Sequence, residues 1–224
     1  MESLDQRLRD VLQAIENAAS DAGRPVPKLL AVSKTRRAAE VAALAAAGQR
    51  AFGENYVQEA TGKRRELADP TLEWHLIGHL QSNKAAEAAE RFDWVQSLDR
   101  PRLVAALDRA RPAGQAPLNV LVQVNVDGEP GKSGCVPAEV DALTDAVASA
   151  ARLRLRGLMA IPAPHPDPAL RRHAFRAMKE LFDHVAARHA GVDTLSMGMS
   201  DDFALAIAEG ATLVRIGTAL FGPR

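Results

Sequence analysis

The chain of 224 residues is poor in cysteine and aromatic residues: it has one cysteine, Cys135, and an aromatic content of 4%. A single thiol cannot form an internal disulfide bond, so the sequence indicates a protein of a reducing compartment. No activating partner for Cys135 is evident, which favours a structural or incidental thiol. Cysteine usage therefore excludes a disulfide-stapled secreted domain.

Excess charge and long apolar runs are also missing. Lys and Arg total 28, as do Asp and Glu, so the formal net charge is zero. This balance gives no support for a nucleic-acid or membrane-surface partner. No apolar run is long enough to span a bilayer, and the first ten residues lack the apolar core of a secretion signal. We therefore expect a cytoplasmic protein without nucleic-acid or membrane partners.

A metal site is not expected either, although His75 and His79 have the four-residue spacing of a helical metal pair. The segment around them is typical of a strand followed by a loop, with Gly78 between the histidines. No carboxylate or cysteine is spaced to complete a zinc site. The pattern thus favours structural histidines.

The sequence does contain a regular alternation of β-type runs and helix-length segments, after an amphipathic segment at residues 3–20. The β-type runs are 29–33, 50–53, 73–77, 94–97, 118–125, 155–161, 194–196 and 212–216. Helix-length segments between them include 38–47, 101–110, 137–150 and 170–189. Such alternation predicts a parallel sheet with right-handed crossovers.

Eight units at a spacing of roughly 25–30 residues favour a closed barrel over a doubly wound open sheet, although periodicity alone leaves both possible. We predict an α/β fold: a single (β/α)₈ TIM-type barrel with an additional N-terminal helix. No linker interrupts residues 1–224, which are expected to form one domain.

Lys34 stands at the end of the first apolar run. In a βα-barrel the carboxyl ends of the strands form the functional rim, so this lysine is expected to face a ligand. Partial desolvation there favours the neutral amine, the form that attacks an aldehyde. The alternative is an ordinary solvated lysine, and Lys34 on its own does not decide between them.

Two later loops, 196–202 and 215–218, follow the seventh and eighth runs. Barrels often bind phosphate with these two loops and the N-terminus of a short helix. Glycines let the backbone approach an anion, and Ser200 and Thr218 add hydroxyl donors. The alternative is a pair of ordinary turns, with Ser200 as a helix cap. Asp201 and Asp202 suit the helix dipole and are not expected to touch an anion.

Motifs along most of the chain resemble those of the pyridoxal phosphate homeostasis proteins, which share the fold of the N-terminal barrel of alanine racemase. The matching segments are AVSKT at 31–35, FGENYVQE at 52–59, WHLIGHLQSNK at 74–84, GLMAIP at 157–162, SMGMSDD at 196–202 and RIGTALFG at 215–222. The resemblance implies pyridoxal 5′-phosphate held as a Schiff base on Lys34, with Asn55 near the cofactor. It also implies a phosphate site formed by Ser200, Gly217 and Thr218.

The same resemblance places Arg215 near the pyridine nitrogen. Because an arginine pKa stays above about 12, Arg215 should remain protonated and disfavour protonation of the ring, which makes the cofactor a poor electron sink. Racemases share this feature, so it does not exclude catalysis. Racemisation also needs a second acid–base group, which alanine racemase takes from another domain. The sequence offers no such domain, and its only tyrosine, Tyr56, follows the second run.

We therefore expect a cofactor-binding and homeostasis protein without catalytic residues. The alternatives are a racemase acting through the same Schiff base and, less favoured, a cofactor-free Schiff-base aldolase. The resemblance suggests transient transfer of cofactor to apo-enzymes. No unpaired hydrophobic stripe demands a dimer, so we expect a monomer.

Overall fold

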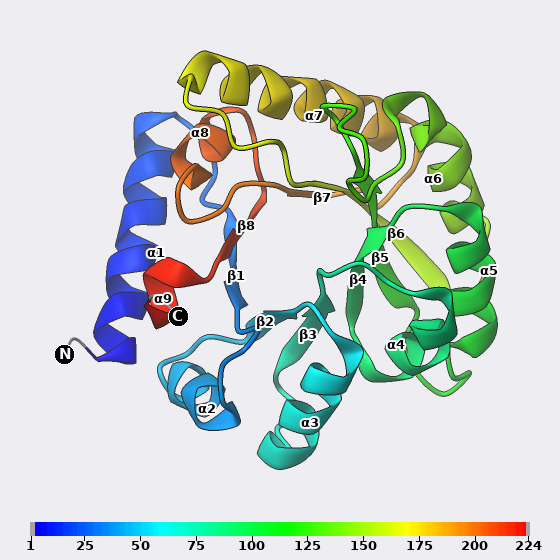
Figure 1. Cartoon of the computed structure of the whole chain (residues 1–224), viewed down its shortest axis with the longest axis horizontal. Helices are drawn as coiled ribbons and strands as arrows, with labels where there is room; N and C mark the ends of the chain where they lie inside the picture. Colours follow the sequence, from blue (N-terminus) through cyan, green and yellow to red (C-terminus); the bar gives the residue numbers. More distant parts are fainter. Residues whose placement is uncertain (1–2, 223–224) are drawn as a thin grey trace.

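The computed structural model describes residues 3–222 and closes eight parallel strands into a barrel in chain order (Figure 1). The strands are β1 Lys28–Val32, β2 Ala51–Glu54, β3 Glu73–Leu76, β4 Trp94–Leu98, β5 Leu118–Val124, β6 Leu153–Ala160, β7 Thr194–Ser196 and β8 Leu213–Ile216. Pairing of β1 with β8 completes the ring. The predicted barrel is confirmed, and the open doubly wound sheet is wrong.

Helices surround this ring (Figure 1). They are α1 Leu4–Asp21, α2 Ala38–Ala46, α3 Val57–Leu67, α4 Ala85–Arg91, α5 Pro101–Ala110, α6 Val140–Ala148, α7 Pro168–Arg188, α8 Phe203–Ala208 and α9 Thr218–Phe221. Two short 3₁₀ turns, η1 Ser82–Lys84 and η2 Pro137–Glu139, precede α4 and α6. Within residues 3–222, no helix is both long enough and apolar enough to cross a membrane.

The additional N-terminal helix, α1, is also confirmed. Ser3 caps it by accepting a hydrogen bond from the Gln6 N–H at 3.2 Å. The buried face of the helix carries Leu8, Val11 and Ile15, the i, i+3, i+7 spacing of one apolar stripe. Figure 1 shows α1 beside α8 and α9, so the first helix covers the side of the barrel where the chain ends.

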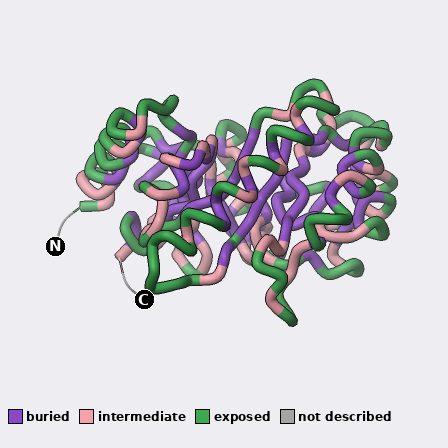
Figure 2. The backbone as a smooth tube through the Cα atoms, turned by 90° about the horizontal axis from the view of Figure 1, so that it is seen from above, coloured by how far each residue is buried: buried purple, intermediate pink, exposed green. Residues whose placement is uncertain are grey.

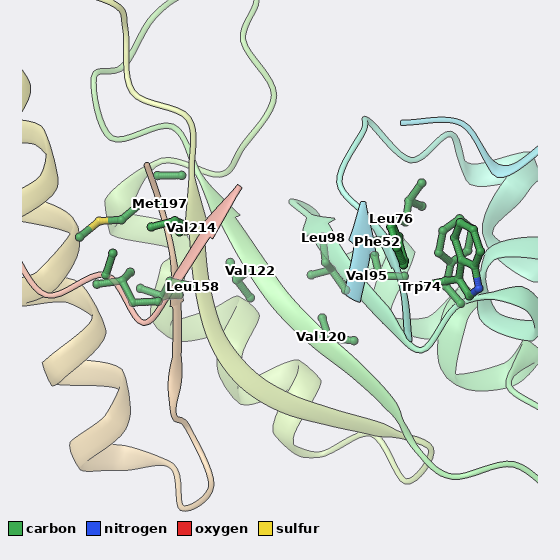
Figure 3. Packing of buried hydrophobic residues seen from close by; sticks show 14 of the residues in the cluster. Phe52, Trp74, Leu76, Val95, Leu98, Val120, Val122, Leu158, Met197 and Val214 are labelled. Carbon is green, nitrogen blue, oxygen red and sulfur yellow. The ribbon is translucent and has the colours of Figure 1, made fainter. Parts of the chain in front are cut away.

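Side chains alternate between two environments along each strand, as a period of two requires. The outward-facing ones form the main core between strands and helices. Figure 2 shows that the buried stretches of the chain run through the middle of the molecule and that the exposed stretches lie at its periphery. Figure 3 shows part of this core on two sides of the barrel, with Met197 and Val214 on one side and Phe52 and Trp74 on the other. The Phe52 and Trp74 rings lie 5.9 Å apart.

The interior of the barrel is filled differently. A small separate cluster of Trp94, Leu121 and Met159 fills part of it. Buried polar residues also lie there. They include His75 on β3, Gln96 on β4, Ser196 on β7 and Arg215 on β8. Buried polar groups are costly unless hydrogen-bonded, so their partners matter for the site above them.

Candidate functional site

A cavity of about 510 Å³ opens at the carboxyl ends of the strands. This volume lies in the range of small-molecule sites. Its wall comes from loops after seven of the strands. All six predicted site residues line it: Lys34, Asn55, Ser200, Arg215, Gly217 and Thr218. The fold therefore brings together side chains that are up to 184 positions apart, from 34 to 218.

Lys34 is half-buried, two residues beyond the end of β1, and the residues on both sides of it are anchored. The Ser33 N–H donates to the Gly53 carbonyl at 3.0 Å, and the Ser33 hydroxyl donates to Glu54 Oε1 at 2.5 Å. The Thr35 N–H donates to Glu59 Oε1 at 2.5 Å. Thr35 has φ +65°, a left-handed conformation that is unfavourable for a β-branched residue. These bonds fix where the Lys34 side chain starts.

A buried lysine, Lys63 of α3, organises those anchors. Its Nζ donates to the Ser33 carbonyl, to Glu54 Oε1 and to Glu59 Oε1, each at 2.7 Å. The Lys63 side chain is 7% exposed and that of Glu54 is fully buried. Burial raises the pKa of Glu54, while the hydrogen bonds and charge of Lys63 oppose that shift. The ion pair thus keeps two charges in the core directly behind the Lys34 turn.

Removing the positive charge of Lys63 should destabilise the folded protein. Because Lys63→Ala leaves the Glu54 charge buried and uncompensated, we expect the free energy of unfolding to fall by about 3–5 kcal/mol. Urea denaturation measures this directly. The control is Lys84→Ala, which removes a surface pair with Glu87 at 3.5 Å and should cost at most about 1 kcal/mol. Equal small losses for both variants would contradict the role given to Lys63.

The two late loops are held against each other at the predicted phosphate site. The backbone N–H of Arg215 donates to the Gly198 carbonyl at 3.0 Å. Gly198 has φ +92°, and an added Cβ would lie 2.6 Å from the Ala206 Cβ, so a larger residue does not fit there. At Gly217 an added Cβ would lie 3.4 Å from Val32. This cradle of backbone and hydroxyl groups at the start of α9 has the chemistry that a phosphate requires.

Two carboxylates follow Ser200 in the first of these loops, and the expectation that neither touches an anion stays a prediction. Asp201 lines the cavity. Asp202 lies at the N-cap of α8, and its Oδ1 accepts a hydrogen bond from the Met199 N–H at 2.7 Å and so closes the loop. Ser200 does not cap α8, because the N-cap position is Asp202.

Arg215 forms the floor of the cavity and is 3% exposed. It donates from Nη1 to Ser196 Oγ at 2.7 Å and from Nη2 to the Ala160 carbonyl at 2.8 Å. Burial lowers its pKa to about 10, with Asp202 opposing the shift. The expectation of a pKa above about 12 is therefore wrong, because it ignored desolvation. The guanidinium still carries its charge at neutral pH.

His75 is a structural histidine in the barrel interior. Its Nε2 lies 2.8 Å from Glu73 Oε1 and its Nδ1 lies 2.9 Å from Gln96 Nε2. Its ring stacks on Trp94 at 5.1 Å. Burial lowers the pKa of His75, against the opposing effect of Glu73. No group of three or more potential metal-binding side chains occurs among residues 3–222.

The lowered pKa of His75 predicts a pH effect on stability. Below its ordinary value of 6.5 the unfolded chain binds a proton at this residue that the folded chain does not. The free energy of unfolding should therefore fall as the pH is lowered through this window, by at most about 1.4 kcal/mol per pH unit. His75→Gln should lack this part of the slope. Parallel slopes for the two proteins between pH 5 and 6.5 would show that His75 takes up its proton when folded.

The cavity also contains polar residues that sequence reasoning missed: His79, Gln123, Lys132 and Ser133. The Ser133 hydroxyl lies 3.1 Å from His79 Nδ1, which joins the loop after β3 to the loop after β5. Lys132 pairs with Glu129 within that second loop. Residues 128–134 follow β5 and form part of the rim, and only the closed ring shows which loops face each other across the mouth.

Comparisons with known proteins show the family and the fold to which this chain is similar. A family model described as alanine racemase, N-terminal domain, matches residues 6–224. The pyridoxal phosphate homeostasis protein of Pseudomonas aeruginosa is 53% identical over 100% of this chain and 97% of its own length. A structure of PipY from Synechococcus elongatus with PLP bound is similar, with a TM-score of 0.86 and 37% identity over 98% of this chain and 100% of that one. An alanine racemase of Corynebacterium glutamicum, 18% identical over 96% of this chain and 62% of its own, shares the fold with a TM-score of 0.72.

Proposed function

The chain belongs to the alanine racemase N-terminal domain family, and from this premise we propose that it binds pyridoxal 5′-phosphate reversibly and serves the homeostasis of that cofactor. Relatives that match its full length are named pyridoxal phosphate homeostasis proteins. The observation that carries the proposal is the convergence of Lys34, the two late loops and Arg215 on one cavity.

Each part of the cofactor has a matching group in the wall. The Lys34 amine would hold the aldehyde as a Schiff base, with water as the leaving group. Ser200, Gly217 and Thr218 would supply hydroxyl and backbone donors to the phosphate. Arg215 would donate to the pyridine nitrogen from the floor, which would keep a proton off the ring. Asn55 would contact the cofactor from the loop after β2.

Several further properties belong to the same proposal. Residues 1–224 act as one domain, as a monomer, in the cytoplasm. Because the cavity opens at the rim of the barrel, bound cofactor can be released to apo-enzymes in transient encounters. Gel filtration with light scattering tests the monomer, and loading of an apo-enzyme by the holo-protein tests the transfer.

Catalysis of racemisation is not part of the proposed function. Lys34 can exchange a proton on one face of a substrate carbon, but turnover needs a fixed group on the other face. Tyr56 is 65% exposed and does not line the cavity. His79 does line it, yet its side chain is half-exposed and its Nδ1 contacts Ser133. The racemase alternative therefore has to take its second group from an ionisable residue at the rim of the cavity: His79, Lys132 or Asp201.

The experiment is chiral analysis of L- and D-alanine, serine and glutamate after incubation with loaded protein in deuterium oxide. We expect no balanced interconversion, although slow deuterium exchange on one face is possible through Lys34. Lys34→Ala provides the blank. Turnover of about 1–1000 per second would instead establish the racemase, and its loss in His79→Gln, Lys132→Ala or Asp201→Asn would identify the second group.

A further inference from the structure

A chain of hydrogen bonds between side chains crosses the barrel beneath the cavity. It runs from Arg215 on β8 through Ser196 on β7, Gln96 on β4 and His75 on β3 to Glu73 at the start of β3. The successive distances are 2.7, 2.7, 2.9 and 2.8 Å. We call these five residues the cross-barrel chain. It connects the floor of the cavity with the opposite end of the barrel.

The chemistry of its two ends fixes the direction of every bond. A carboxylate only accepts, so His75 Nε2 carries the proton that faces Glu73. Burial keeps His75 neutral, which leaves Nδ1 as an acceptor for the Gln96 amide N–H. The amide oxygen of Gln96 then accepts from the Ser196 hydroxyl. The oxygen of Ser196 is thereby available to Arg215, which can only donate.

This one-way arrangement has two consequences for Arg215. The ends of the chain carry opposite charges, so each bond polarises the next and strengthens it. In addition, the Ser196 and Ala160 bonds hold two of the five guanidinium N–H groups. The plane of the guanidinium is therefore fixed, and so are the directions of its remaining N–H donors. Arg215 lines the cavity with this fixed group.

We propose that Glu73, His75, Gln96 and Ser196 are positioning residues that aim Arg215 at the ring nitrogen of pyridoxal 5′-phosphate, with Glu73 acting from the far end of the barrel. The inference rests on the proposed function, since it assigns the ring nitrogen to Arg215. Glu73 is accessible at that far end, where it lines a second cavity of about 220 Å³ together with His75 and Trp94.

The test compares two ligands in Gln96→Leu: pyridoxal 5′-phosphate and its 1-deaza analogue, in which a C–H replaces the ring nitrogen. The Kd for pyridoxal 5′-phosphate should rise about tenfold, equivalent to about 1.4 kcal/mol, whereas the Kd for the deaza analogue should change less than about twofold. The matched control is Gln49→Leu, which removes another buried glutamine, bonded to the Leu29 and Ala51 carbonyls. It should show no preference between the ligands.

A second measurement needs no ligand. Side-chain ¹⁵N chemical shifts of the protein labelled at histidine, assigned with His75→Gln, should show His75 as the neutral Nε2–H tautomer. Glu73→Gln, a half-exposed position, should mix the two tautomers and raise the Kd for pyridoxal 5′-phosphate about threefold, while sparing the deaza analogue. If Gln96→Leu does not fold, Glu73→Gln still tests whether the cross-barrel chain positions Arg215.

The possible failures are distinct. If the wild-type protein binds neither ligand, the proposed function fails and the inference fails with it. If it binds both, but Gln96→Leu and Glu73→Gln weaken them equally, the cross-barrel chain is only structural. An Nδ1–H tautomer of His75 would likewise overturn the inference.

Discussion

Replacing Lys34 by alanine is expected to abolish the visible absorption of the protein loaded with pyridoxal 5′-phosphate and to weaken binding about a hundredfold or more, equivalent to about 2.8 kcal/mol. The amine is the only group we assign to the aldehyde, so its removal leaves the phosphate loops and Arg215 as the remaining contacts. Lys34 is half-buried at the rim, where such a change costs little stability. Absorption titration and thermal melting measure the two effects.

The matched control is Lys132→Ala, because Lys132 is the other lysine that lines the cavity. This variant should retain the visible band and most of the affinity, since the Lys132 ammonium pairs with Glu129 in its own loop. A band that survives in Lys34→Ala and disappears in Lys132→Ala would reassign the attachment site.

Removing the phosphate from the ligand should have a comparably large effect. Charge-assisted hydrogen bonds contribute roughly 1.5–3 kcal/mol each, and the loops at Ser200 and at Gly217–Thr218 supply at least two. Pyridoxal should therefore bind about a hundredfold to ten-thousandfold more weakly than pyridoxal 5′-phosphate. Competition titrations with the two aldehydes give the ratio.

Thr218→Val serves as the structural check on this prediction, because it removes one hydroxyl from an exposed position and keeps the side-chain shape. It should reduce the preference for the phosphorylated form about tenfold and leave the Kd for pyridoxal almost unchanged. Equal affinity of the wild-type protein for both aldehydes would mean that the late loops have another role.

Much of the fold could be predicted because each strand is encoded by a short pattern of neighbouring residues. Buried parallel strands form short apolar runs, so the β-type runs at 94–97 and 194–196 fall on β4 and β7 with at most one residue of difference. The sixth strand begins at Leu153, before the predicted 155, because Leu153 and Leu155 are both buried while the arginine between them is exposed. The exposed Arg154 interrupts the apolar run, so the apolar pattern placed the start of that strand two residues too late.

The surroundings of the site could not be predicted in the same way, because they depend on contacts across the closed ring. Gln96 meets Ser196 at a separation of 100 positions, and His79 meets Ser133 at 54. Residues 63–66 are Lys, Arg, Arg and Glu, a charged run of the kind found on solvated helix faces, yet Lys63 is buried against Glu54. Only the register of the barrel decides which polar residues of neighbouring and opposite strands face each other.

The central claim is that the cavity holds pyridoxal 5′-phosphate on one particular amine. Reduction of the loaded protein with borohydride fixes the attachment as a stable secondary amine, and peptide mapping by mass spectrometry locates it. The predicted result is a single modified peptide, with the adduct on Lys34. An adduct on Lys132 or Lys84, with Lys34 unmodified, would contradict the account.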